Sequence, residues 1–160
     1  MKDKTLNILK YILQEYPHKS ELSASRVTKI IYLSDWKSSI DNEIQLTDSK
    51  WYFNHYGPYV EDFIDIAKND SDIEIINEKT IFGGRKRLLK LSKSYKGKVQ
   101  LDERDKSLVN FVINATKSKN YEDFIKLVYS TYPVITNDKY SELDLVRLAE
   151  EYKKILEKEK

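Results

Sequence analysis

Cysteine is absent from this chain of 160 residues. Its absence excludes disulfide bonds, thiol nucleophiles and thiolate metal sites. Histidine occurs only as His18 and His55, so a zinc enzyme is not expected, and the sequence predicts no metal site. No apolar run approaches the roughly 20 residues that a membrane helix needs, and the first residues lack the apolar stretch of a signal peptide. We therefore expect a cytoplasmic protein with no membrane partner.

Glycine is scarce as well, and its four positions are Gly57, Gly83, Gly84 and Gly97. These positions allow neither a GxxxxGK(S/T) phosphate loop nor a GxGxxG turn, and the chain has no GxSxG elbow or HExxH helix. Asp41, Asp48 and Lys50 mimic the carboxylates and lysine of a metal-dependent nuclease. Such a trio arises by chance in a chain with 34% charged residues. The sequence therefore predicts no enzyme, no catalytic residues and no cofactor.

The charged residues are unevenly distributed, although the formal net charge is only +2. Residues 40–78 contain ten acids and two bases, whereas residues 79–98 contain eight bases and no acid. The two blocks could neutralise each other within the fold or remain solvated. Alternatively, the basic block could contact a phosphate backbone or an acidic protein.

Apolar residues recur with helical spacing in several segments. They predict a helix over 3–16 that Pro17 ends, and a second helix that begins near the N-cap Ser23 and lies at the centre of the core. Residues 38–50 have no clear period and are expected to be mostly loop. A third helix should follow Gly57, with Pro58 at its first position. Later helices are predicted over 103–117, over 121–132 after the cap Asn120, and over 142–158 after the cap Ser141.

The stretches 73–76 and 81–91 resemble strands, and Gly83 and Gly84 separate two such runs, which predicts a hairpin with a two-residue turn at the glycines. That turn pairs Phe82 with Arg85 and places Glu78 opposite Leu89. Because side chains alternate, one face then carries Ile76, Glu78, Thr80, Phe82, Arg85, Arg87, Leu89 and Leu91. The whole element order predicts a mainly α (α+β) fold, a single helical domain of about six helices with a small antiparallel β-hairpin or sheet.

Aromatic residues crowd the segment 51–59, in which His55 could titrate near neutrality or contact a partner. The alternative is a half-buried histidine that is hydrogen-bonded at the mouth of a turn. The chain has twelve tyrosines, a residue type that suits contact surfaces, although several must belong to the core.

Three ordered blocks resemble a known family: KIIYLSDW at 29–36, WYFNHYGPY at 51–59 and FIKLVYSTYP at 124–133. Together they are similar to the Panacea domain, also called the SocA-like antitoxin domain, of phage-associated proteins. The resemblance covers about residues 1–134 and makes 135–160 a C-terminal helical extension, which we expect to pack on the same domain. The signature residues, expected to be mostly structural, are Lys29, Tyr32, Asp35, Trp36, Trp51, Tyr56, Gly57 and Pro58.

The resemblance implies a protein that binds and neutralises a cognate toxin by direct contact, and some relatives act as adaptors that deliver the toxin to a protease. We expect the contacts to involve Arg85, Lys86, Arg87, Tyr59 and His55. The alternative is a nucleic-acid-binding regulator of the winged-helix kind, with the second or third helix in the DNA groove and the basic hairpin of residues 79–98 as the wing. The sequence leaves the oligomeric state open.

Overall fold

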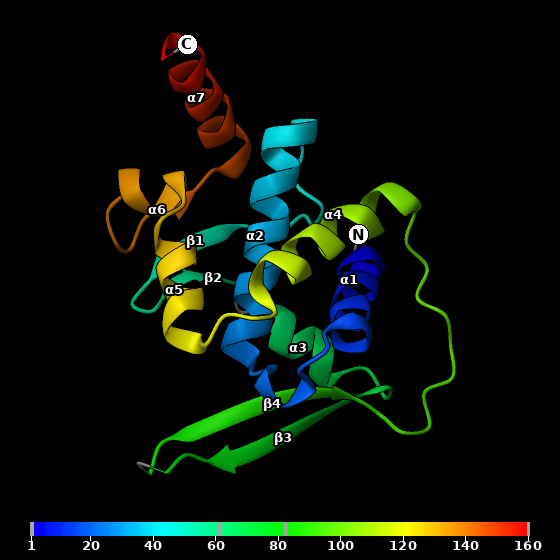
Figure 1. The fold of residues 1–160 in the computed structure, drawn as a ribbon. Helices are drawn as coiled ribbons and strands as arrows, with labels where there is room; N and C mark the ends of the chain where they lie inside the picture. Colours follow the sequence, from blue (N-terminus) through cyan, green and yellow to red (C-terminus); the bar gives the residue numbers. More distant parts are fainter. Residues whose placement is uncertain (1, 61, 82, 160) are drawn as a thin grey trace.

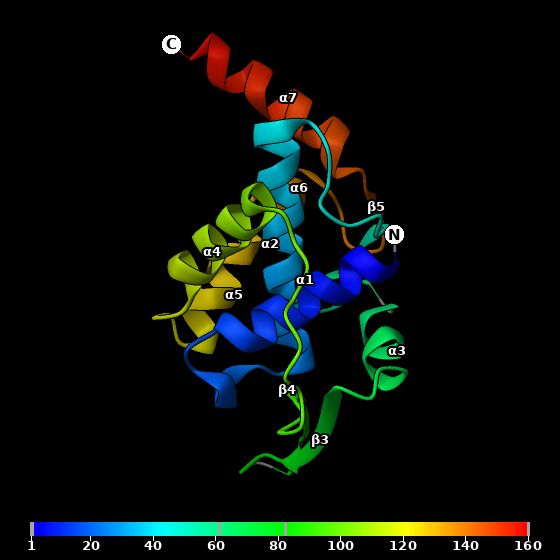
Figure 2. The ribbon, with the colours of Figure 1, turned by 90° about the vertical axis from the view of Figure 1, so that its right-hand side faces the viewer.

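The computed structural model describes residues 2–60, 62–81 and 83–159. A long helix, α2 (Ala24–Asn42), runs through the middle of the molecule, with the other helices around it, as Figure 1 and Figure 2 show. As predicted, its N-cap is Ser23, whose hydroxyl accepts a hydrogen bond from the backbone N–H of Arg26. The helices in contact with it are α1 (Lys2–Glu15), α4 (Glu103–Thr116), α5 (Tyr121–Tyr129) and α7 (Leu145–Lys158).

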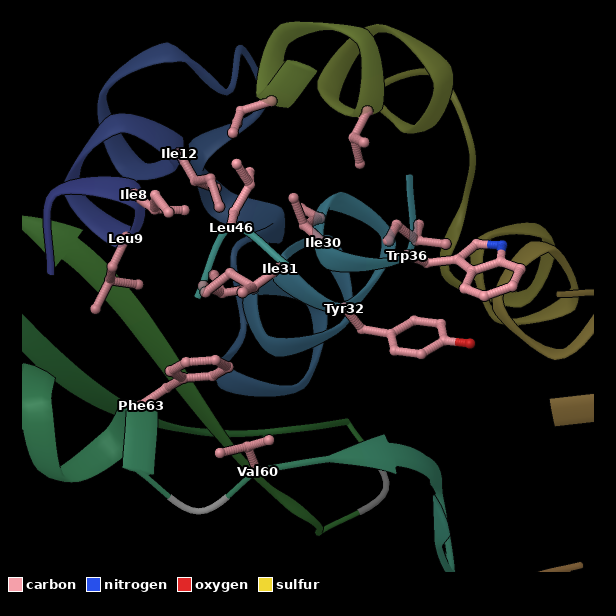
Figure 3. Packing of buried hydrophobic residues seen from close by; sticks show 14 of the residues in the cluster. Ile8, Leu9, Ile12, Ile30, Ile31, Tyr32, Trp36, Leu46, Val60 and Phe63 are labelled. Carbon is pink, nitrogen blue, oxygen red and sulfur yellow. The ribbon is translucent and has the colours of Figure 1, made fainter. Parts of the chain in front are cut away.

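The hydrophobic core surrounds α2, as the apolar stripe predicts. Ile30 and Ile31 are 0% exposed. Figure 3 shows Ile8 of α1 on one side of these residues and Phe63 of α3 (Asp62–Lys68) on another. Removing this apolar surface from water is the main favourable contribution to folding. The elements around α2 are therefore held in place by packing against this helix.

Helix α2 is longer than the sequence predicts, because residues 38–42 are helical rather than loop. Ser38 and Ser39 are both buried, and the hydroxyl of Ser39 donates to the backbone carbonyl of Asp35 at 2.7 Å. Small polar side chains can thus be buried against neighbouring elements without an apolar pattern. The helix ends at Asn42, and the positive φ of 61° at Glu43 turns the chain away.

The aromatic segment forms the middle of a small antiparallel sheet. Strand β1 (Trp51–Asn54) lies between β2 (Gly57–Tyr59) and β5 (Glu142–Leu143). Pro58 lies in β2, where it pairs with Phe53 of β1, so its predicted place at the start of a helix is wrong. Proline is tolerated there because β2 is an edge strand, in which a missing N–H need not break a ladder bond.

The helix predicted over 121–132 ends early, and a separate short helix follows it. Helix α5 ends at Tyr129, and α6 (Tyr132–Thr136) begins after Thr131 with Pro133 in its first turn. Proline has no N–H to donate to the preceding turn and its ring clashes with that turn, so α5 cannot continue through this position.

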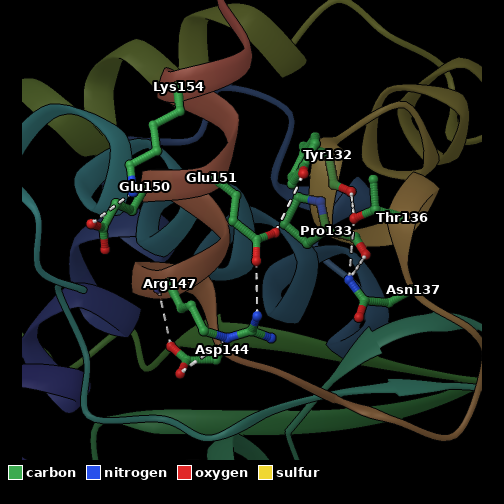
Figure 4. A network of polar contacts seen from close by, with 9 residues as sticks. All are labelled: Tyr132, Pro133, Thr136, Asn137, Asp144, Arg147, Glu150, Glu151 and Lys154. Atoms are coloured by element: carbon green, nitrogen blue, oxygen red, sulfur yellow. Dashed lines mark hydrogen bonds and ion pairs between the residues drawn. The ribbon is translucent and has the colours of Figure 1, made fainter.

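Helix α7 begins later than the sequence predicts. Its N-cap is Asp144 rather than Ser141, because residues 142–143 pair with β1 as β5. Figure 4 shows Asp144 beside Arg147 at the helix start, and Glu151 one turn further on between Arg147 and Tyr132 of α6. Polar contacts thus join α7 to α6, and its buried Leu148 packs into the core.

Strands β3 (Ile73–Lys79) and β4 (Arg85–Leu91) form the hairpin, whose tip projects away from the helices (Figure 1). The predicted register is wrong by three residues, because Lys79 pairs with Arg85 and Glu78 lies opposite Lys86 rather than Leu89. Phe82, which the prediction paired with Arg85, lies outside the described residues.

The turn of the hairpin is wider than the predicted two residues, and the hydrogen bonds of Thr80 explain why. Its backbone N–H donates to the Gly84 carbonyl at 2.7 Å, and its hydroxyl accepts from the Gly84 N–H at 2.9 Å. Gly83 supplies the positive φ of 80°. The turn thus closes earlier in the chain than a two-residue turn at the glycines, and an odd shift moves the β3 side chains to the other face. Ile75 therefore lies beside Leu89, while Ile76 is 38% exposed.

The described ranges contain seven α-helices and five strands. The prediction of a mainly helical α+β fold with a small antiparallel sheet is therefore confirmed, with one helix more than expected. Within these ranges, no helix is both long and apolar enough to cross a membrane.

The hairpin gives a first test of the register. Leu89 is 2% exposed, so Leu89→Ala is expected to lower the free energy of unfolding by about 2 to 5 kcal/mol. The triple variant Arg85→Ala, Lys86→Ala and Arg87→Ala should change it by only about 0.5 kcal/mol per residue, because these side chains lie outside the core. Urea unfolding measures both. A stable Leu89 variant beside an unfolded triple variant would show that the strand assignment is wrong.

Candidate functional site

The side chain of Asp35 connects α2 to the loop that leads into β1. It is fully buried, and its carboxylate accepts hydrogen bonds from the backbone N–H of Thr47 at 2.9 Å, from the Thr47 hydroxyl, and from the indole Nε1 of Trp51 at 2.8 Å. Burial raises the pKa of Asp35 to about 6, although these hydrogen bonds oppose the shift. Asp35 therefore acts as a polar anchor inside the core.

The signature aromatics pack around this anchor. The rings of Tyr32 and Trp51 meet edge to face at 5.4 Å, and the Tyr32 hydroxyl lies 2.8 Å from Oγ1 of Thr131. Burial raises the pKa of Tyr32 above its usual range. Trp36 packs against Tyr152 of α7 at 5.8 Å. These residues join α2 to the sheet and to the C-terminal helices, which is a structural role.

Lys29 and Gly57 meet where β2 approaches α2. Lys29 is 3% exposed, burial lowers its pKa to about 8, and its Nζ donates to Ser25 Oγ at 3.1 Å. Gly57 has a φ of 106°, a conformation that L side chains rarely adopt. A Cβ at this position would lie 3.1 Å from Cε1 of Tyr129 and 3.4 Å from Cε of Lys29. The glycine therefore allows β2 to lie close to α2 and α5.

Tyr56 and His55 differ from the other signature and candidate residues, because they lie on the surface of the turn between β1 and β2. Tyr56 is 77% exposed. His55 is exposed rather than half-buried, with its ring against that of Tyr56 at 4.6 Å and its Nδ1 3.4 Å from the Tyr140 hydroxyl. Both side chains are accessible to a partner.

The structure separates the predicted contact residues into two surfaces. Arg85, Lys86 and Arg87 line a groove of about 750 Å³ between β4, the first turns of α2 and α5, and Tyr56. We call it the hairpin groove. Tyr59 instead lines a cavity of about 1070 Å³ between α1, β1 and α3. The two surfaces therefore require separate tests.

The bases of the hairpin have no ion-pair partner in the described part of the chain. Glu78 lies opposite Lys86 across the hairpin, and Glu74 lies opposite Lys90, yet neither pair comes within the 4 Å of an ion pair. Mutual neutralisation of the acidic and basic blocks by such pairs is therefore not observed among these residues. The basic side chains remain available to solvent or to a partner.

The second cavity has a more acidic lining. Asp48, Lys50, Asp65 and Asp70 contribute to it. Asp41, the third member of the nuclease-like trio, is not among the lining residues and instead pairs with Lys37 on α2 at 2.8 Å. The described residues contain no group of three histidine or carboxylate side chains placed to hold a metal ion. The structure thus does not assemble the trio.

Sequence reasoning missed Ser25 and Tyr121, which close one end of the hairpin groove. Their hydroxyl oxygens lie 2.9 Å apart and join the first turn of α2 to the first turn of α5. Each follows a cap that the sequence predicts, Ser23 and Asn120. No sequence signal, however, brings these two helix starts together.

One comparison with known proteins gives a match to a protein family. The family model described as "Antitoxin SocA-like, Panacea domain" matches residues 27–133, more than half of the chain, including the blocks at 29–36, 51–59 and 124–133. No curated protein and no solved structure matches the chain.

The contact at Gly57 generates a test of its structural role. Gly57→Ala is expected to destabilise the protein by about 2 to 4 kcal/mol, because backbone strain adds to the close contact with Tyr129. Gly83→Ala is a matched control, since Gly83 also has a positive φ but nothing lies within 4 Å of its added Cβ. The control should cost only about 1 kcal/mol. Equal losses in thermal unfolding would contradict close packing at Gly57.

The buried Asp35 predicts a pH dependence. Its pKa is raised from 3.8 to about 6 on folding, so the folded state binds the proton more tightly, and this group's contribution to stability falls as the pH rises through that window. Asn does not titrate. The free energy of unfolding of Asp35→Asn minus that of wild type should therefore rise by on the order of 2 to 3 kcal/mol from about pH 4 to pH 7. Urea unfolding at several pH values measures the difference. A constant or falling difference contradicts the assignment, and exposed Asp41→Asn is the control.

Proposed function

Because the chain belongs to the SocA-like antitoxin family of Panacea domains, we propose that it binds a cognate toxin protein and neutralises it by direct contact. The action is binding rather than catalysis, and it uses no cofactor. An adaptor that presents the bound toxin to a protease is a variant of the same function, since it needs the same contact.

The proposed contact surface is the hairpin groove with the adjacent turn of His55 and Tyr56. The observation that carries this choice is the set of bases at Arg85, Lys86 and Arg87, which have no ion-pair partner among the described residues. Such charges increase the association rate and the specificity for a partner of opposite charge. Most signature residues are buried, so they support the surface rather than contact the partner. We assign Tyr59, which lines the second cavity, to a secondary contact with the partner.

We further propose that residues 135–160 are an extension added to the family domain at about residue 134 and packed on it. The family match ends at 133, and α7 contacts both α2 and α6. In this arrangement the extension completes the core without contributing to the hairpin groove.

Nucleic-acid binding remains the alternative, with the basic hairpin as a wing. The described helices favour it less than protein binding. Helix α2 is buried on most of its surface, and α3 is a seven-residue helix of sequence DFIDIAK, with two acids and one base. Neither presents the basic face that a recognition helix places in a DNA groove.

Co-expression with the protein encoded by the adjacent gene tests the proposal. That protein should arrest growth alone, and the wild-type chain should restore growth and co-purify with it. The triple variant Arg85→Ala, Lys86→Ala and Arg87→Ala should bind about tenfold more weakly or worse. The triple variant Lys93→Ala, Lys96→Ala and Lys98→Ala removes the same charge from exposed positions outside the groove and should bind normally.

Several results would overturn the proposal. One is a neighbour that is harmless alone, and another is a toxic neighbour that the wild-type chain neither binds nor silences. Equal losses in the two triple variants would indicate that only net charge matters. Duplex DNA retained at physiological as well as low salt would favour the nucleic-acid alternative.

A further inference from the structure

The edge of β4 that faces away from β3, here called its outer edge, is only partly covered by the rest of the chain. Near its inner end the backbone N–H of Leu89 donates to the carbonyl of Leu22 at 3.0 Å, and Ser23 forms an antiparallel bridge with Leu88. At Ala24 the chain enters α2, so this third strand stops at once. In the described part of the chain, β3 is the only strand in the sheet of β4, and it lies on the other edge.

The strand geometry identifies the backbone groups that remain on this edge. In an antiparallel strand the N–H and C=O groups of alternate residues point to the same side. Since the N–H of Leu89 points outward to Leu22, the backbone groups of Arg87 and Arg85 point outward as well. Those of Lys86 point to β3, where its partner is Glu78. The bridge between Ser23 and Leu88 directs the Arg87 carbonyl to Ala24, so the outer half of β4 leaves the N–H of Arg87 and both backbone groups of Arg85 for an added strand.

This edge forms one wall of the hairpin groove. Figure 1 shows β4 on the side of β3 that faces the helices, and the starts of α2 and α5 line the other side of the groove. The groove volume of about 750 Å³ falls within the range of about 300 to 1,000 Å³ that is usual for ligand sites. The groove thus has room for a short extended segment.

The charges around the edge favour an acidic segment. Arg85, Lys86 and Arg87 line the groove with Arg26, against the single acid Glu21. Arg26 is already used, because its guanidinium donates to Tyr16 and to two backbone carbonyls and lies 3.7 Å from Glu21. The bases of β4 have no such partners among the described residues. Unpaired sheet edges are also liable to pair with other chains, and charged side chains limit that pairing to complementary ones.

We propose that the outer edge of β4 binds an extended acidic segment of a partner protein as an added strand, antiparallel to β4 and in line with Leu22–Ser23. Arg85 and Arg87 lie on one face of β4, so carboxylates at alternate positions of the segment face them. Lys86 lies on the opposite face. This inference rests on the proposed function for the identity of the partner, and it adds the chemistry and conformation of the segment that is bound.

A labelled peptide tests the inference directly. The probe is a peptide of about ten residues in which glutamate alternates with threonine, and fluorescence anisotropy measures its binding to the full chain. The matched control is the same peptide with alternate backbone nitrogens methylated, which keeps the charge and removes the edge hydrogen bonds. We expect methylation to weaken binding about tenfold or more. The variant Arg85→Ala, Lys86→Ala and Arg87→Ala should lose binding, and Lys93→Ala, Lys96→Ala and Lys98→Ala should keep it.

Hydrogen exchange locates the added strand at single residues. Without peptide, the amides of Arg85 and Arg87 should exchange fast, while that of Lys86 is protected by its pairing with β3. With peptide, the first two should slow about tenfold or more and Lys86 should change little. No binding, equal binding of the methylated peptide, or unchanged exchange at Arg85 and Arg87 would overturn the inference. Tighter binding of duplex DNA than of the peptide at physiological salt would also overturn it.

The inference and the proposed function can fail separately. If the chain neutralises its neighbour and the groove variant does so equally well without binding the peptide, only the edge site is wrong. If the peptide binds as described but no neighbouring protein is bound or silenced, the edge site stands and the antitoxin function is wrong.

Discussion

A carboxylate inside the core is the constraint on which much of this structure depends. Asp35 must be surrounded by donors, because a buried charge without hydrogen bonds is costly. Thr47 and Trp51 supply them, so the chain after α2 has to fold back along that helix before it enters β1. Strand β1 is the middle of its sheet. The anchor therefore also determines where β2 lies, and with it the exposed turn beside the hairpin groove.

The sequence predicts those parts of the fold that local patterns encode. Helical spacing and the Ser23 cap define α2, and the predicted cap Asn120 accepts from the backbone N–H of Asp123 at the start of α5. The failures occur where a contact distant in sequence competes with a local signal. Residues 142–143 could start a helix, but pairing with β1 makes them a strand and moves the cap to Asp144. At the hairpin, the hydroxyl of Thr80 outweighed the glycine pair that local reasoning used to set the register.

The candidate site is likewise predictable from the sequence only in part. The basic block is visible in the sequence, and the structure places Arg85 and Arg87 at exposed positions on a projecting hairpin. The opposite wall is not visible, because it combines the start of α2, the start of α5 and a turn of the small sheet, which are far apart in the chain. Only the packing of the core brings them together. The bond between Ser25 and Tyr121, two exposed hydroxyls on different helices, has no counterpart in any linear motif.

The packing around α2 has a consequence for how the family region can be handled. The matched residues 27–133 include neither α1 nor α7, yet Ile12 and Leu148 from those helices belong to the same core, and Tyr152 covers Trp36. Excising the matched region would strip both flanks of the central helix and leave a wide apolar surface in water. The segment that defines the family is thus smaller than the part of the chain that shares its core. A fragment cut at the match boundaries would self-associate rather than fold as a monomer.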